Sequence, residues 1–315
     1  MSERHVIALA GGTGDLGRYI HEELVKDDSY TVALLTRKTS PPPSTLPHTT
    51  VHTTDYTHSS ILQILNATKA TALISTIRCD HVDFLEPHKA LVQACLDSKS
   101  CKRFIPSEWA GDIESFPAIP RFYAETRGPL REYLKSIPKN DLQWTLFNLG
   151  WFMEYFIPAG KSYMKLLPGE FPFDLEKCTY AVRGGGDVLQ SCTFGRDVGR
   201  AVAVLLGVDE WEPVTYVSSE WYTMNEAAAK LEKFYGRTFS RTHRSLEEIN
   251  AALAAAEKDP STDPLELAQI EQWEVSGATA CPREKTLRQR EKYFSSLKFV
   301  TIDEMLKMGK EMDHV

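Results

Sequence analysis

The chain has 315 residues, 42% of them hydrophobic, and a formal net charge of −7 with acidic and basic residues interspersed. This length and composition fit one large α/β domain, or a main domain with a smaller lobe, around a substantial core. The net charge argues against nucleic acid or a membrane surface as the main partner. No apolar run reaches the roughly 18 residues that a membrane span requires.

The six cysteines are scattered, without a CxxC pair or the spacing of a metal site. We interpret them as free thiols in a reducing compartment, and we expect no metal. The first five residues are polar and an apolar run follows at once, which is not the pattern of a signal or transit peptide. We therefore expect a soluble, cytoplasmic protein that is a monomer or a homodimer.

The N-terminal segment carries the most informative pattern. An apolar run over 6–10 ends in the turn Gly11-Gly12-Thr13-Gly14-Asp15-Leu16-Gly17, and a helical pattern follows. The glycines fit two registers, Gly12-x-Gly14-x-x-Gly17 and Gly11-x-x-Gly14-x-x-Gly17. A buried strand, a glycine turn and a helix in this order predict a dinucleotide site, because free backbone N–H groups and the positive helix end face a pyrophosphate. The alternative is an ordinary glycine-rich βα turn.

Apolar and helical segments alternate over the first half of the chain. Because parallel strands with crossover helices produce this alternation, it predicts an α/β fold with a doubly wound parallel sheet. Proline and glycine at 128–129 should kink or restart one helix. The expected strands cover 6–10, 30–35, 49–55, 72–77, 103–106 and 142–148. A first helix begins at the glycine turn, and the later helices cover 59–67, 83–97 and 120–134.

The second half is less regular and predicts a smaller lobe over the nicotinamide end of a cofactor. We divide the chain into a dinucleotide-binding domain, 1–150, and a mainly substrate-binding lobe, 151–315, with some segments returning to the first domain. Asp197, or a residue just before it, should cap the helix that starts there. The expected strands cover 180–182, 188–194 and, as the last one, 214–218, and the helices cover 197–206, 224–235, 246–258, 263–274 and 302–308.

Two cations follow the second expected strand. An acidic residue at this place, about 20 residues after the glycines, would bind a ribose 2′-hydroxyl, but the residues are Arg37 and Lys38. A guanidinium beside an ammonium suits a 2′-phosphate, so the sequence favours NADPH over NADH. The alternative is a solvated basic turn. Thr76 and Asn148, at the ends of two later strands, should also lie against the cofactor, because ligands bind outside the carboxyl ends of parallel strands.

Five segments resemble one known family. They are AGGTGDLG at 10–17, LTRK at 35–38, KRFIPSEW at 102–109, GWFMEYF at 150–156 and TFGRDVGRA at 193–201. Together they resemble the isoflavone reductase-like branch of the NmrA-like atypical short-chain dehydrogenases, most closely its fungal members, many of which serve secondary metabolism. The resemblance covers nearly the whole chain. It implies an NADPH-dependent reductase with an extended Rossmann fold and a small α+β C-terminal substrate lobe.

The resemblance fails at the lysine that serves plant members as general acid or base. When residues 130–134 are set against the family's Val-Arg-Arg-like stretch, Arg127 stands at the lysine position. Arginine hardly deprotonates, but it can polarise a carbonyl or hold an oxyanion or a carboxylate. Tyr123-x-x-x-Arg127 is similar to the Tyr-x-x-x-Lys of typical short-chain dehydrogenases. Tyr123 is therefore a candidate acid, with Arg127 favouring its ionised form; the alternatives are a core tyrosine and a solvated arginine.

Several further residues are candidates for binding a flat, apolar substrate. Glu108 and Trp109 follow the fifth expected strand, and Trp151, Phe152 and Tyr155 follow the sixth. Aromatic side chains suit such a substrate, but they are also common in cores, and Glu108 could instead accept hydrogen bonds from a turn.

These patterns leave three hypotheses about function. The leading one is hydride transfer from NADPH to a small aromatic or polyketide-like molecule, with Tyr123 and Arg127 stabilising the developing negative charge. The second is a regulator that binds a dinucleotide without catalysis, as NmrA itself does. The third is a non-redox isomerase or cyclase on the same fold, which the absence of the lysine would allow.

Overall fold

The computed structural model describes residues 4–37, 46–78, 84–259 and 264–315. Its centre is a sheet of six parallel strands in the order β3-β2-β1-β4-β5-β6. The order reverses between β1 and β4, which is where such sheets bind ligands. The strands are β1 (His5–Ala10), β2 (Tyr30–Thr36), β3 (Thr49–Thr53), β4 (Ala72–Ser75), β5 (Arg103–Ile105) and β6 (Gln143–Trp144).

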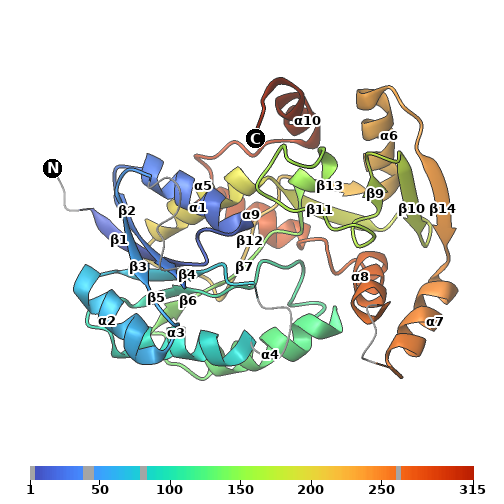
Figure 1. Cartoon of the computed structure of the whole chain (residues 1–315). Helices are drawn as coiled ribbons and strands as arrows, with labels where there is room; N and C mark the ends of the chain where they lie inside the picture. The colour runs from blue at the N-terminus through green and yellow to red at the C-terminus, as the bar shows by residue number, and fades with distance from the viewer. Residues whose placement is uncertain (1–3, 38–45, 79–83, 260–263) are drawn as a thin grey trace.

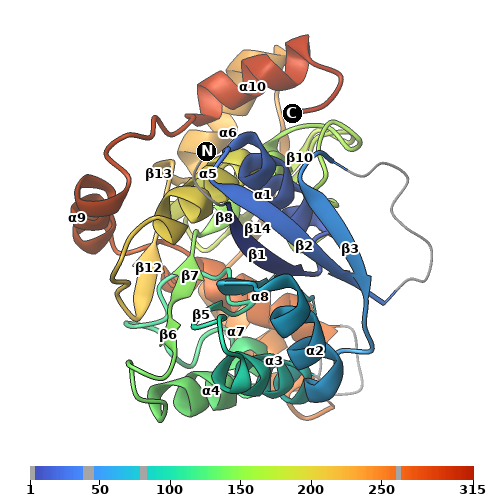
Figure 2. The same cartoon turned by 90° about the vertical axis from the view of Figure 1, so that its left-hand side faces the viewer.

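Helices cover both faces of this sheet (Figure 1 and, in the view turned by 90°, Figure 2). Alternate residues of β1 serve the two faces: Ile7 and Leu9 belong to one core cluster, and Ala8 and Ala10 to the other. Burial on both sides explains the continuous apolar strands, and the predicted doubly wound α/β fold is confirmed. The first face carries α1 (Asp15–Lys26) and α5 (Gly195–Leu206), and the second carries α2 (His58–Thr68), α3 (Leu85–Asp97) and α4 (Arg121–Lys135).

The strand predicted over 142–148 is divided in two, so this prediction was wrong. Its second part is β7 (Leu146–Asn148), which pairs in parallel with β12 (Val214–Tyr216) rather than with β5. At the division, the hydroxyl groups of Thr145 and Thr215 share a hydrogen bond of 2.8 Å. A segment almost 70 residues further along the chain thus continues this edge, and a local pattern cannot reveal such a partner.

Of the two outcomes expected at residues 128–129, a kink or a restart of the helix, the structure excludes the restart. The helix α4 is continuous, with Pro129 in its interior. Pro129 removes the hydrogen bond to the carbonyl of Glu125, but both residues are exposed, so water can reach that carbonyl. The continuity matters because α4 carries Tyr123 and Arg127.

Most of the later chain forms a smaller α+β part at the right of Figure 1, with the strand orders β13-β11-β8 and β14-β10-β9. Because β13 and β14 follow residues 214–218, the prediction that 214–218 is the last strand was wrong; β14 is polar and almost fully exposed, without an apolar period. The division at residue 150 stays a prediction. The strands are β8 (Trp151–Phe152), β9 (Phe173–Asp174), β10 (Thr179–Arg183), β11 (Leu189–Thr193), β13 (Glu220–Thr223) and β14 (Ser240–Arg244).

The helices expected in this part are present. The first of them ends at Gly236 in the left-handed conformation, as its glycine predicts. They are α6 (Met224–Tyr235), α7 (Leu246–Ala256), α8 (Pro264–Ser276) and α10 (Ile302–Glu311). No helix in the described parts of the chain combines the length and the apolar character that crossing a membrane would need.

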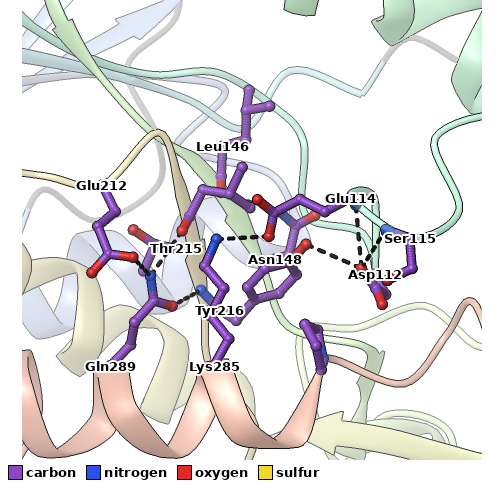
Figure 3. Close-up of polar contacts among 12 residues, drawn as sticks. Asp112, Glu114, Ser115, Leu146, Asn148, Glu212, Thr215, Tyr216, Lys285 and Gln289 are labelled. Carbon is purple, nitrogen blue, oxygen red and sulfur yellow. Dashed lines mark hydrogen bonds and ion pairs between the residues drawn. The ribbon is translucent and has the colours of Figure 1, made fainter.

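One helix, α9 (Arg283–Tyr293), was missed, because seven of its eleven residues are charged and it shows little apolar periodicity. Polar contacts hold it to β12 (Figure 3). The buried side chain of Gln289 accepts a hydrogen bond from the backbone N–H of Tyr216 (2.8 Å) and donates to the carbonyl of Val214 (2.9 Å). Lys285 binds Glu114 at 2.7 Å. The amide contacts therefore hold the helix to β12, and the ion pair holds it to the segment that contains Glu114.

A buried arginine joins α8 to the strands beside it. Arg183, at the end of β10, lies 2.6 Å from a carboxylate oxygen of Glu274 and 3.5 Å from one of Glu271. Its guanidinium also donates to the carbonyls of Gly169 and Glu170, both at 2.7 Å. One side chain thus fixes the 169–170 turn and α8 relative to each other.

The N-terminus of α5 is capped from outside its own segment. Glu154, in the 3₁₀ helix η2 (Met153–Phe156), accepts a hydrogen bond from the N–H of Gly195 at 2.7 Å. The predicted capping role of Asp197 was wrong, since Asp197 accepts from the N–H of Val300 at 2.7 Å instead. Burial raises the pKa of Glu154 from its usual 4.5 to about 8, so its carboxyl group favours the protonated form in the folded protein.

The protonated form of Glu154 predicts a pH dependence of stability. Because the folded pKa is raised, this contribution is complete below pH 4.5 and is lost as the pH rises through about 8, at up to about 1.4 kcal/mol per pH unit. Glu154→Gln should flatten this part of the profile, since glutamine keeps an oxygen for Gly195. Urea unfolding at a series of pH values measures the effect, with exposed Glu132→Gln on α4 as control. Parallel profiles for wild type and Glu154→Gln would contradict it.

Candidate functional site

A cavity of about 450 Å³ lies outside the carboxyl ends of β1, β2, β4 and β5. One of its walls comes from the glycine-rich turn and the strand ends, and the other from α4, α8 and the segments around 150–155 and 164–170. The structure thus brings most of the predicted site residues around one cavity. Those lining it are Gly11, Thr13, Gly14, Asp15, Leu16, Arg37, Thr76, Glu108, Trp109, Tyr123, Arg127, Trp151, Phe152 and Tyr155.

The glycine-rich turn fits the register Gly11-x-x-Gly14-x-x-Gly17. Gly11 has φ +76°, and a Cβ on it would lie 2.9 Å from the backbone of Thr76. A Cβ on Gly17 would lie 2.6 Å from the Cα of Gly12, so Gly17 permits the close packing of helix and turn and does not itself line the cavity. Gly14 is the N-cap of α1, where no described side chain caps the helix. The first N–H groups of α1 are therefore left for a ligand.

Arg37 lines the cavity at the end of β2, where the sequence places it. It is exposed, and its Cζ lies 5.2 Å from the centre of the Tyr56 ring. Tyr56 in turn donates a hydrogen bond to the carbonyl of Leu35 at 3.0 Å, which fixes the ring beside the strand end. Lys38 lies outside the described residues.

The two remaining cofactor candidates behave differently. Thr76 lines the cavity and donates to the carbonyl of Ala10 at 3.0 Å. Asn148 is fully buried and is not part of the cavity wall, so the prediction that it contacts a cofactor was wrong. Its amide accepts from the N–H of Ala110 (3.2 Å) and donates to the carbonyl of Leu146 (3.1 Å). Asn148 therefore positions the 109–110 segment through its backbone.

The segment that carries Glu108 and Trp109 is fixed on two sides. The carboxylate of Glu108 binds Arg131 of α4 through two hydrogen bonds, at 2.6 and 3.1 Å, with both side chains at least nine-tenths buried. The indole N–H of Trp109 donates to the carbonyl of Ser75 at 3.0 Å. Glu108 thus lines the cavity as half of an ion pair, and the alternative of a carboxylate that binds only a turn was wrong.

Tyr123 and Arg127 lie on consecutive turns of α4. The Cζ of Arg127 is 3.9 Å from the centre of the Tyr123 ring and 4.8 Å from that of Phe84, so the guanidinium lies against aromatic faces. Arg127 is only 6% exposed, which excludes a solvated arginine. The structure therefore brings the two predicted catalytic residues together; their roles stay predictions.

Aromatic side chains form the wall opposite the glycine-rich turn. The rings of Trp151 and Trp273 lie 5.0 Å apart, and those of Tyr123 and Trp273 lie 6.0 Å apart. Burial, with Tyr123 and Glu154 nearby, raises the pKa of Tyr155 above its ordinary value, so its hydroxyl stays a neutral donor at neutral pH. This wall suits an apolar, planar ligand.

Sequence reasoning missed about a third of the cavity wall. Residues Ile270 and Trp273 are spaced by one helical turn on α8, a signal that predicts a buried face but not what that face covers. The missed residues with long side chains are Tyr56, Phe122, Met164, Lys165, Leu167, Glu170, Glu266, Ile270 and Trp273. Among the described residues, no group of three or more His, Cys, Asp or Glu side chains is arranged to hold a metal ion.

Comparison with known families decides the relationship. The model of the NmrA-like family matches residues 3–306. The chain belongs to the NmrA-like family. This membership confirms the resemblance seen in the sequence, including its fungal character: among the curated relatives of this NmrA-like protein is the oxidoreductase swnR of Arthroderma benhamiae, which is 34% identical over 307 residues and 97% covered in both chains.

Solved structures share the fold. This NmrA-like protein is similar to the crystal structure of isoflavone reductase, with a TM-score of 0.71, 18% identity, and 97% and 99% of the two chains covered. It is also similar to AtPrR2 solved with NADP+ and (+)pinoresinol, with a TM-score of 0.73, 18% identity, and 98% and 100% covered. At these identities the likeness supports the fold alone.

The Glu108–Arg131 pair predicts a large loss of stability when it is broken. Arg131→Leu leaves a buried, unpaired carboxylate and should lower the free energy of unfolding by about 3–5 kcal/mol. The double variant Glu108→Leu/Arg131→Leu removes both charges and should recover part of this loss. Arg121 lies on the same helix, and Arg121→Leu breaks only its exposed ion pairs with Glu125 and Glu257, so it should change stability much less. Urea unfolding measures all three, and a double variant no more stable than Arg131→Leu would contradict the argument.

Proposed function

We propose that the protein is an NADPH-dependent reductase that transfers hydride to a small aromatic or polyketide-like molecule. The observation that carries the proposal is the single cavity that joins the glycine-rich turn and Arg37 to an aromatic wall beside Tyr123 and Arg127. The relative named an oxidoreductase and the related structure solved with NADP+ and an aromatic compound support it. An aromatic wall continuous with the nucleotide end favours an enzyme over a regulator that only senses the nucleotide.

The described residues fit an adenine dinucleotide. Gly11 and Gly14 line the cavity with bare backbone at the start of α1, where free N–H groups suit a pyrophosphate, and a Cβ on Gly11 would collide with the backbone of Thr76. Arg37 offers a guanidinium, in place of the carboxylate that binds a ribose 2′-hydroxyl, to a 2′-phosphate. When bound, NADPH supplies the hydride.

The remaining chemistry belongs to side chains on α4 and on the aromatic wall. Trp151, Tyr155 and Trp273 exclude water and hold a flat substrate. The hydroxyl of Tyr123 donates a proton to the substrate atom, oxygen or carbon, on which negative charge develops. The guanidinium of Arg127 beside it stabilises that charge. This arrangement needs no deprotonated arginine.

The direct test is a screen of small aromatic and polyketide-like ketones, enones and imines with NADPH, followed through the absorbance of the reduced nucleotide. Substrate-dependent loss of NADPH supports the proposal. Turnover without loss of NADPH would instead support an isomerase or cyclase, and a protein that binds neither NADPH nor NADH would overturn it.

The assignment of Arg37 predicts nucleotide selectivity. Arg37→Glu should weaken NADPH binding by roughly 10- to 100-fold, because it removes a charge-assisted hydrogen bond and adds a repelling carboxylate. NADH, which lacks the 2′-phosphate, should lose less than about threefold by the same reasoning. Calorimetric titration of both nucleotides measures the difference, and equal losses would contradict the role.

The role of Tyr123 predicts a loss of turnover without a loss of cofactor affinity. On any compound that the screen shows to be reduced, Tyr123→Phe should lower kcat by about 10²- to 10⁴-fold. NADPH affinity should be unchanged, since only the hydroxyl is removed. Tyr133→Phe on the same helix, whose hydroxyl contacts Gln93 away from the cavity, is the matched control. Equal rates for wild type and Tyr123→Phe would assign the proton to another donor.

A further inference from the structure

Arg127 is a buried cation that forms no ion pair with any of the residues that the structure describes. Its side chain lines the cavity and is 6% exposed. Within the described parts of the chain, it makes one hydrogen bond, from Nη1 to the hydroxyl of Thr126 at 3.1 Å, its Nε is buried without a partner, and no carboxylate lies within 4.0 Å. Burying an unpaired guanidinium raises the free energy of the folded protein, unless an anion binds it.

The next arginine on the same face of α4 is an example of a buried guanidinium that is paired with a carboxylate. Arg131 lies one turn further along and holds the carboxylate of Glu108 through Nε and Nη2. Two like charges four residues apart repel each other on a helix. Glu108 neutralises Arg131, so Arg127 is left as the unpaired charge of the two.

The neighbours of Arg127 cannot neutralise it. The rings of Phe84 and Tyr123 offer their faces, at 4.8 and 3.9 Å from Cζ. His88, whose ring stacks on that of Phe84, is neutral, because burial lowers its pKa to about 4. Contacts to ring faces stabilise a guanidinium but leave the N–H groups at its edge available, and that edge matches the two oxygens of a carboxylate.

We propose that Arg127 binds a carboxylate of the substrate, so that the reduced molecule is an unsaturated acid rather than a neutral phenol or polyketide. This rests on the proposed function and narrows its substrate class. The acid group lies against Arg127 and the planar part against Trp151 and Trp273, which leaves Tyr123, one turn earlier on α4, beside the atoms that react. Arg127 thus selects and orients the substrate, and Tyr123 supplies the proton.

The anion could also come from the nucleotide, since a phosphate has the same chemistry. The two sources are separated by measuring acid binding with the nucleotide site saturated. The phosphate cradle lies at the start of α1, whereas Arg127 lies on α4 beside the aromatic wall, so the geometry favours the substrate.

The experiment compares acids with their neutral amides. Benzoate and benzamide, and cinnamate and cinnamamide, are titrated calorimetrically into wild type, Arg127→Gln, Arg127→Lys and Arg121→Gln, each with and without saturating NADP+. Wild type and the exposed-site control Arg121→Gln should prefer each acid over its amide by at least about tenfold. Arg127→Gln should bind acid and amide equally, and Arg127→Lys, which keeps the charge but not the planar edge, should keep part of the preference.

The outcomes are distinguishable. Equal binding of acids and amides by wild type, no acid binding at all, or an acid preference that survives in Arg127→Gln overturns the inference. A loss of NADP+ affinity of more than about tenfold in Arg127→Gln, with its acid preference intact, assigns the arginine to the nucleotide. If Arg127→Gln does not fold, Arg127→Lys carries the comparison, and an undiminished preference there overturns the role of the planar edge. Failure of wild type to bind NADP+ defeats the proposed function, while the titrations without nucleotide still test Arg127.

Discussion

The cavity depends on how closely α1 approaches the turn that follows β1. Side chains at Gly11 and Gly17 would collide with the backbone of Thr76 and of Gly12, so only bare backbone lets strand, turn and helix meet there. That approach brings the N-terminus of α1 to the point where the strand order of the sheet reverses. The end of the cavity that we propose for the nucleotide follows from this packing, and α4 and α8 build the aromatic end against it.

The parts of this arrangement that the sequence predicts are those with a local cause. The strand–turn–helix pattern predicts Gly11, Gly14 and the helix start, because each feature lies within a few residues of the next. The place of Arg37 follows from the length of one βα unit. The fold class follows in the same way from alternating strands and helices.

The parts that the sequence does not predict depend on distant partners. Asn148 ends a predicted strand, but β12 pairs with that strand, and the side-chain amide of Asn148 accepts a hydrogen bond from the N–H of Ala110. Glu108 was expected to contact ligand or turn, whereas Arg131, 23 residues later, takes both of its oxygens. Ile270 and Trp273 form the face of α8 that lines the cavity. Their apolar character predicts that this face is buried, but not that it borders a cavity.

Neighbouring residues of α8 have two different roles, since some anchor the helix and others line the cavity. Glu271 and Glu274 bind Arg183, which also holds the 169–170 turn, whereas Ile270 and Trp273 face the cavity. The contacts that anchor the helix are therefore not the contacts that touch a ligand. Exchanges at Ile270 and Trp273 can reshape the substrate end while the anchor and the nucleotide end keep their positions, so related proteins can diverge in specificity without rebuilding the sheet.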